Sequence, residues 1–206
     1  MSTGDPRPAR TRQRLFDALY QLAETHDLAS LSISEIARTA GVDRGSFYAQ
    51  FADKEAFLDT VGDLLIAEFE EMNANFEAVE IYERDEIPVE EVPSLYRIIA
   101  THPGLYRQML LGSGSLHTAL RLQEHMERGF IRIFSQTGRD VPGDLPIEIR
   151  ARFVTYGILG LVTRWLDHGN AEDVDQYTIW AWEFLAMHGL RRPNIRVRAR
   201  ERANIS

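Results

Sequence analysis

The sequence contains no cysteine. This excludes a disulfide framework, a cysteine-based zinc site, an iron–sulfur cluster and a thiol nucleophile. Long apolar runs are also lacking: the longest, Gly157 to Val162, is far shorter than the roughly 20 residues that span a bilayer. The first ten residues are polar and no apolar segment follows them, so we expect no secretory signal. These absences favour a cytoplasmic protein.

Lysine is nearly absent: Lys54 is the only one, beside 22 arginines. The net charge of -8 is unevenly distributed along the chain. Residues 1–54 carry seven basic and seven acidic residues and are neutral, residues 55–190 carry a net charge of -13, and residues 191–206 carry +5. Acidic surface repels phosphate. A contact with nucleic acid is therefore expected only near the ends of the chain.

Apolar residues recur at three- and four-residue steps through nearly every long segment, which indicates helices. The spacing predicts a first helix from about Thr11 to Glu24 and a fourth that starts after Asp53 and continues through Phe76. Two more are predicted at about Ile147–His168 and Asp173–His188. No segment alternates apolar and polar residues over a strand's length, so strands are not expected. The sequence predicts an all-α fold with about nine helices.

Residues 32–51 have the pattern of a helix-turn-helix. Ser32 and Glu35 fit a capping box at the start of one short helix, and Gly41 suits the left-handed backbone at its end. Asp43 is the expected N-cap of a second short helix. Phe47 is expected to face the core, so that the other side of this helix faces outward, where a major groove can receive it.

Three segments of the sequence are characteristic of a known family: SISEIA at 32–37, AGVDRGSFYAQF at 40–51 and DKEAFL at 53–58. Through them, residues from about Arg10 to Val61 resemble the DNA-binding domain of the TetR family of transcriptional regulators. The later helices are similar to the family's ligand-binding and dimerisation domain only in length and order. The resemblance implies a DNA-binding domain at 1–54 and a ligand-binding and dimerisation domain at 55–190. The six arginines at 191–206 leave two interpretations open, a basic, disordered tail or a second contact with DNA.

The resemblance also implies roles for single residues. Arg44 would read the edge of a guanine base, and Tyr48 and Lys54 would contact phosphates. The full predicted DNA-binding set is Ser32, Ser34, Arg44, Gly45, Ser46, Tyr48, Ala49, Gln50 and Lys54.

Two positions depart from the family pattern, which often has an aromatic residue where this chain has Ala49 and histidine where it has Gln50. They leave open a second hypothesis, a protein-interaction adaptor that kept the fold without binding a specific operator. The arginine-rich segment at the N-terminus also leaves two interpretations open. Its arginines form either an arm that follows a DNA groove or backbone, or a mobile tail: Arg7, Arg10, Arg12 and Arg14.

The helix predicted at 147–168 is apolar around much of its circumference, and Gly157 and Gly160 would let another helix approach. Together with the last helix it predicts a four-helix homodimer interface. The resemblance implies a small-molecule effector. The aromatic residues indicate that it is apolar or amphiphilic, with an anionic group that Arg164 or His168 would take. Its candidate lining residues are Phe69, Tyr106, Phe130, Phe134, Tyr156, Arg164 and Trp165.

No acidic residue shares a helix face with His102, His117, His125 or His168, and Ser113 and Ser115 lack the strand-turn-helix context of a nucleophile. We therefore expect no metal, no cofactor and no enzymatic activity. The first hypothesis is a repressor that binds double-stranded DNA at a palindromic operator as a homodimer and is released by an unknown small molecule.

Overall fold

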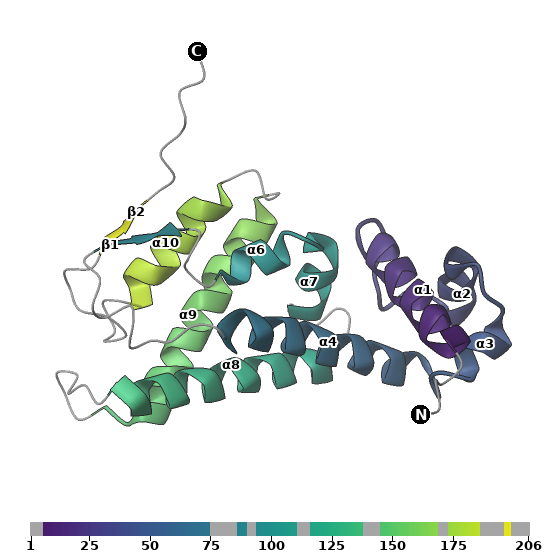
Figure 1. Cartoon of the computed structure of the whole chain (residues 1–206), viewed down its shortest axis with the longest axis horizontal. Coiled ribbons are helices and arrows are strands. Elements are labelled where there is room, and N and C mark those ends of the chain that lie inside the picture. The colour runs from purple at the N-terminus through teal and green to yellow at the C-terminus, as the bar shows by residue number, and fades with distance from the viewer. Residues whose placement is uncertain are drawn as a thin grey trace, which may run out of the picture. The chain divides into compact units, whose positions relative to one another are not determined.

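The computed structural model describes residues 6–74, 86–89, 94–110, 116–137, 145–168, 173–185 and 196–198. Within these residues it contains nine helices, which confirms the all-α prediction (Figure 1). The helices are α1 (Pro6–Ala23), α2 (Ile33–Ala40), α3 (Arg44–Tyr48), α4 (Lys54–Ala74), α6 (Leu95–Ile99), α7 (Pro103–Leu110), α8 (Leu116–Thr137), α9 (Ile147–Asp167) and α10 (Val174–Leu185). In the described part of the chain, no helix is both long and apolar enough to cross a membrane.

The chain forms two compact units. Unit 1 comprises residues 1–66 and 102–122, and unit 2 comprises residues 67–101 and 123–206. Helix α7 and the start of α8 thus share a unit with the helix-turn-helix, although they lie in the range predicted for the ligand-binding domain. The predicted domain boundaries remain a prediction.

Four phenylalanines form the core of unit 1. Among the rings of Phe16, Phe47, Phe51 and Phe57, five pairs have centroids 4.8–6.1 Å apart, and all four rings are nearly fully buried. Burying one such side chain stabilises a fold by about 1.5–3 kcal/mol. Because the four rings come from α1, α3, the turn after α3, and α4, their packing fixes the short α3, which has only five residues.

Helix α1 begins earlier than its apolar spacing predicted, at Pro6 rather than about Thr11. Two prolines stand in its first turn, where a missing N–H breaks no helical hydrogen bond. The four arginines predicted to form an arm or a tail are therefore helical, so the mobile tail was wrong, whereas their contact with DNA stays a prediction.

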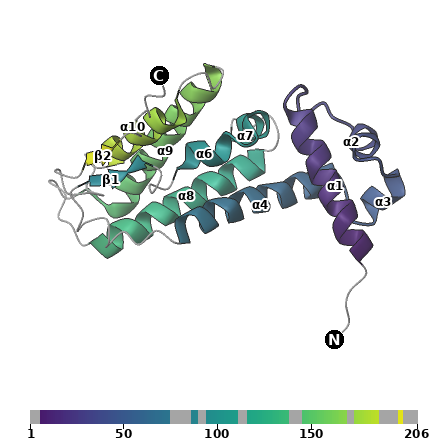
Figure 2. The same cartoon turned by 45° about the horizontal axis from the view of Figure 1, so that its top comes forward.

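In unit 2, α9 and α10 lie side by side (Figures 1 and 2). An aromatic cluster joins them to α6. The ring of Tyr96 on α6 meets Trp165 of α9 at 5.8 Å and Tyr177 of α10 at 5.5 Å, and all three are at most 2% exposed. Where α10 crosses α9, a side chain on Gly157 would collide with the Phe184 ring at 2.9 Å.

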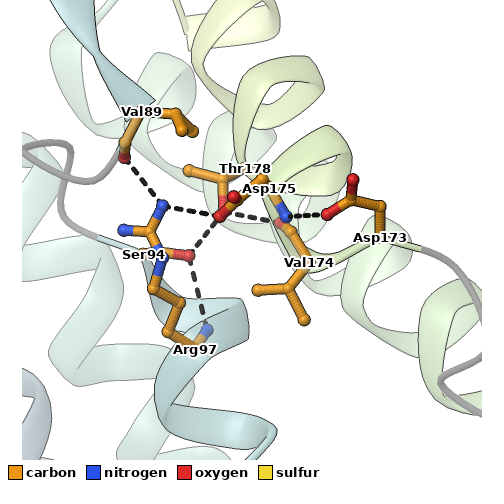
Figure 3. A network of polar contacts seen from close by, with 7 residues as sticks. All are labelled: Val89, Ser94, Arg97, Asp173, Val174, Asp175 and Thr178. Carbon is orange, nitrogen blue, oxygen red and sulfur yellow. Dashed lines mark hydrogen bonds and ion pairs between the residues drawn. The ribbon is translucent and has the colours of Figure 1, made fainter. Parts of the chain in front are cut away.

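A polar network ties α6 to α10 (Figure 3). The guanidinium of Arg97 donates to the Val89 carbonyl at 2.7 Å and pairs with Asp175 at 3.0 Å. The buried Ser94 hydroxyl caps α6 and also lies 2.5 Å from the Thr178 hydroxyl. Figure 3 shows these side chains turned toward one another between the two helices.

The expectation of no strands was wrong for six residues. Strands β1 (Glu86–Pro88) and β2 (Arg196–Arg198) pair in parallel. Three residues are too few to show alternation, and the partners stand far apart in the sequence, so no local pattern announces the pair. Strand β2 lies inside the range predicted as a disordered tail, while the end of the predicted fourth helix at Phe76 falls outside the described residues.

Candidate nucleic-acid interface

The caps predicted for the helix-turn-helix are all confirmed. Ser32 and Glu35 make a complete capping box on α2. The helix ends at Gly41 with φ +63°, the left-handed conformation that favours glycine. The Asp43 carboxylate accepts the Ser46 N–H at 2.8 Å and so begins α3. The turn between α2 and α3 is therefore set by local contacts, each typically worth about 1 kcal/mol.

Helix α3 turns one face inward and one outward. Phe47 is fully buried, whereas Arg44 is exposed and Tyr48 is 47% exposed. The guanidinium of Arg44 lies 6.0 Å from the Tyr48 ring, a cation–π distance that keeps both side chains together on the outer face. The small residues Gly45 and Ala49 are also exposed there, as predicted for a surface that approaches DNA closely.

Two serines of the predicted DNA-binding set donate their hydroxyl protons to carboxylates within the protein. The Ser46 hydroxyl donates to Asp43 at 2.8 Å, and the Ser32 hydroxyl donates to Glu35 at 2.6 Å. The pKa of Asp43 is held below its ordinary value by the Ser46 N–H and then by the Ser46 hydroxyl, and the pKa of Glu35 is lowered chiefly by the Ser32 hydroxyl. A hydroxyl has a single proton to donate. Of the predicted serines, only the exposed Ser34 has no such internal bond among the described residues.

Lys54 differs most from its predicted role. Its ammonium donates to the carbonyls of Leu28, Ala29 and Leu31, each at 2.8 Å. An ammonium carries three donors, so these bonds use all of them. The structure thus gives Lys54 a structural role, closing the turn between α1 and α2, and leaves it no N–H for a phosphate.

The same turn is held from α7 by Gln108, a residue that the sequence did not single out. Its amide nitrogen donates to the carbonyls of Ala23 and His26 at 2.8 Å, and its amide oxygen accepts the Leu28 N–H at 2.5 Å. Gln108 has no motif around it, and its partners precede it by about 80 residues. No sequence signal could have revealed this contact.

Two arginines of α1 pack on the helix-turn-helix. Arg14 donates to the Gly41 carbonyl at 2.8 Å, and Arg12 lies 5.6 Å from the Phe51 ring and 3.5 Å from the side-chain oxygen of Gln50. Both therefore buttress the fold, and Gln50, predicted to contact DNA, has Arg12 as a partner.

The predicted ligand-lining residues fall in both units. Tyr106 belongs to unit 1 and the other six to unit 2. Phe134 and Trp165 are buried, Phe69 and Phe130 are half-buried, and Tyr156 and Arg164 are exposed. Phe130 stacks on Phe134 at 6.2 Å, and Phe69 meets the His125 ring edge-on. The set remains a prediction. Among the described residues, no cluster of three or more possible metal ligands is present.

Comparison with known proteins agrees with this geometry. Residues 15–61 match the model of the bacterial regulatory proteins of the tetR family, and residues 92–178 match that of a transcriptional regulator C-terminal region. The HTH-type transcriptional regulator AcrR of Shigella flexneri is 32% identical over 68 residues, 33% of this chain and 32% of AcrR. The chain thus matches about a third of this relative's length.

Two solved structures are similar over most of their length. The fatty acid degradation regulator FadR from Bacillus halodurans aligns with a TM-score of 0.64 and 16% identity, covering 90% of this chain and 96% of FadR. SmeT, the repressor of the Stenotrophomonas maltophilia multidrug efflux pump SmeDEF, aligns with a TM-score of 0.64 and 17% identity, covering 88% and 93%. Both family models match the chain, and its helix-turn-helix and helical fold agree with them. The chain belongs to the TetR family of transcriptional regulators.

Proposed function

We propose that this regulator is a repressor that binds a palindromic operator as a homodimer and is released by a small molecule. The observation that carries the proposal is the outer face of α3, where Arg44 and Tyr48 are exposed on a helix fixed by the buried Phe47 and the Asp43 cap. An exposed guanidinium on such a helix can donate two parallel hydrogen bonds to guanine in the major groove.

The homodimer is supported by an apolar stripe along α9. Ile149, Phe153 and Tyr156 are 43%, 69% and 55% exposed and follow one another at steps of four and three residues, so they share a helix face. Gly160 continues the stripe, and a side chain there would meet nothing within 4 Å. Large apolar side chains exposed in a row mark an interface. The proposed occupant is the same stripe of a second copy, since a two-fold dimer presents its two α3 helices to the two halves of a palindrome.

Release requires the effector to favour a conformation that binds DNA poorly. A preference of about 2.7 kcal/mol weakens DNA binding a hundredfold. Helix α4 is a suitable transmitter because it is one helix that begins at Lys54 in unit 1 and continues into unit 2. Within unit 1, Lys54 of α4 and Gln108 of α7 hold the same turn, so a shift of either helix would displace α1 and α2.

Selection from random DNA sequences at low and moderate salt tests the proposal. The expected result is one enriched palindrome, with Arg44→Ala relaxing preference at one position in each half-site. Tyr48→Phe, which removes only a hydroxyl, should weaken all sequences alike. Recovery of no motif, with binding that disappears uniformly as salt rises, would contradict the proposal and favour the adaptor hypothesis.

A further inference from the structure

Arg150 is a buried cation in unit 2. It stands on the inner face of α9, four residues before Val154 and eight before Ile158, and is 8% exposed. Its Nε is buried and has no hydrogen-bond partner. The centre of the guanidinium lies 3.7 Å from the centroid of the Phe134 ring, a distance that requires the ring to cover one face of the group.

The neighbouring arginines show what Arg150 lacks. Arg152, two residues further along α9, is exposed and pairs with Glu127 at 3.1 Å. Arg97 pairs with Asp175 and a carbonyl (Figure 3). Among the residues that the structure describes, no carboxylate forms an ion pair with Arg150. Buried charges in proteins are normally paired.

The position of Arg150 on α9 adds to the uncompensated positive charge. Arg150 is the fourth residue of the helix, next to the end where backbone N–H groups point outward and the helix dipole is positive. No side chain caps that end, because Pro146 occupies the N-cap. Burial lowers the pKa of Arg150, which reflects the same lack of a compensating charge.

We infer that Arg150 binds the carboxylate or phosphate of a small molecule. With one face covered by Phe134, the guanidinium keeps its in-plane N–H donors, whose fork matches a planar carboxylate or a phosphate. The half-buried Phe130, stacked on Phe134, supplies an apolar wall beside the charge for an amphiphilic anion. This assigns the anionic group to Arg150 in place of Arg164 and His168, which are both exposed.

Thermal melting of the full chain tests the site, with inorganic phosphate, octanoate and uncharged 1-octanol as probes. Octanoate should raise the melting temperature of the parent protein and of Arg152→Met, the matched control on the same helix. In Arg150→Met its apparent affinity should fall about 10- to 100-fold, as expected for a charge-assisted hydrogen bond. 1-Octanol should have little effect on any of the three proteins.

The apo protein gives a second readout. Arg150→Met should melt no lower than the parent, because removing an unpaired buried charge relieves its desolvation. Protection by phosphate alone identifies a site for free anions, and protection by octanoate alone one for an anionic headgroup; both support the inference. If neither anion protects, or if Arg150→Met responds like the parent, the inference is wrong. If Arg150→Met does not fold, Arg150→Lys, which keeps the charge but loses the fork, should lower the affinity about tenfold in calorimetric titration.

The inference rests on the proposed function only for the regulatory role of the ligand. Release of DNA is measured separately, by fluorescence anisotropy of a labelled operator in the presence of the anion that protects. An anion that protects through Arg150 but leaves the operator bound would contradict its role as effector and leave the site intact.

Discussion

Replacing Lys54 by methionine tests whether the lysine serves the fold or the DNA. Methionine keeps most of the length of the side chain and removes the three hydrogen bonds to the carbonyls of Leu28, Ala29 and Leu31. At about 1 kcal/mol for each bond, the variant should lose about 3 kcal/mol of unfolding free energy. For a chain of this length that corresponds to a fall in melting temperature of about 6–12 °C.

Arginine at the same position separates charge from geometry. Lys54→Arg keeps the positive charge, but its planar guanidinium cannot direct donors to three carbonyls that converge on one ammonium. If the role is structural, both variants melt lower than the parent. If Lys54 instead contacts a phosphate, Lys54→Arg should melt like the parent and bind DNA almost normally.

The salt dependence of DNA binding gives the decisive measurement. Each phosphate contact that is lost reduces the slope of log affinity against log salt by about 0.9. The expected slope for Lys54→Met, from fluorescence anisotropy on a selected operator below the melting range, is that of the parent protein. A slope reduced by about 0.9 for each protomer, with an unchanged melting temperature, would refute the structural role.

Four further predictions concern residues with defined surroundings. Gly41→Ala should lower the melting temperature in scanning fluorimetry, because alanine at φ +63° is strained by about 1 kcal/mol and its Cβ would lie 2.5 Å from Arg14 Nη2. The pKa of Asp43 is lowered by its hydrogen bonds to the start of α3. The ionised carboxylate therefore stabilises the fold fully above the ordinary aspartate pKa of about 3.9, and this stabilisation is lost as the pH falls. In Asp43→Asn, acid unfolding should lack this part of the loss of stability. Gln108→Leu should cost about 2 kcal/mol in urea unfolding, because it leaves three backbone groups without this partner. Phe153→Glu should convert the proposed dimer into a monomer in light scattering, and an unchanged mass would exclude the α9 stripe as the interface.

The local part of the interface could be predicted from the sequence because its signals are local. Ser32 with Glu35, Gly41, and Asp43 act on backbone groups within about four residues, so their spacing carries the geometry. The orientation of α3 could also be predicted locally. Once Phe47 is expected in the core, the opposite side of this helix must face outward.

The tertiary contacts could not be predicted in this way. Lys54 meets carbonyls 23–26 residues earlier, and Gln108 meets a turn about 80 residues earlier, so neither leaves a pattern in its own segment. Arg150 is an intermediate case. It was not singled out from the sequence, although its spacing places it on one helix face with Val154 and Ile158, and only the structure shows that no described carboxylate pairs with it.

A count of donors narrows the DNA-binding surface further. Ser46 cannot donate to a phosphate while its hydroxyl proton holds Asp43, and releasing that proton would loosen the cap that starts α3. The same applies to Ser32 and its capping box. Residues that look alike in a family motif can therefore act in different ways, some by shaping the reading helix and others by touching DNA. In this chain the direct contacts are expected from Ser34, Arg44 and Tyr48, which are exposed, and substitutions at Ser46 or Ser32 should change affinity only as far as they change the stability of the caps.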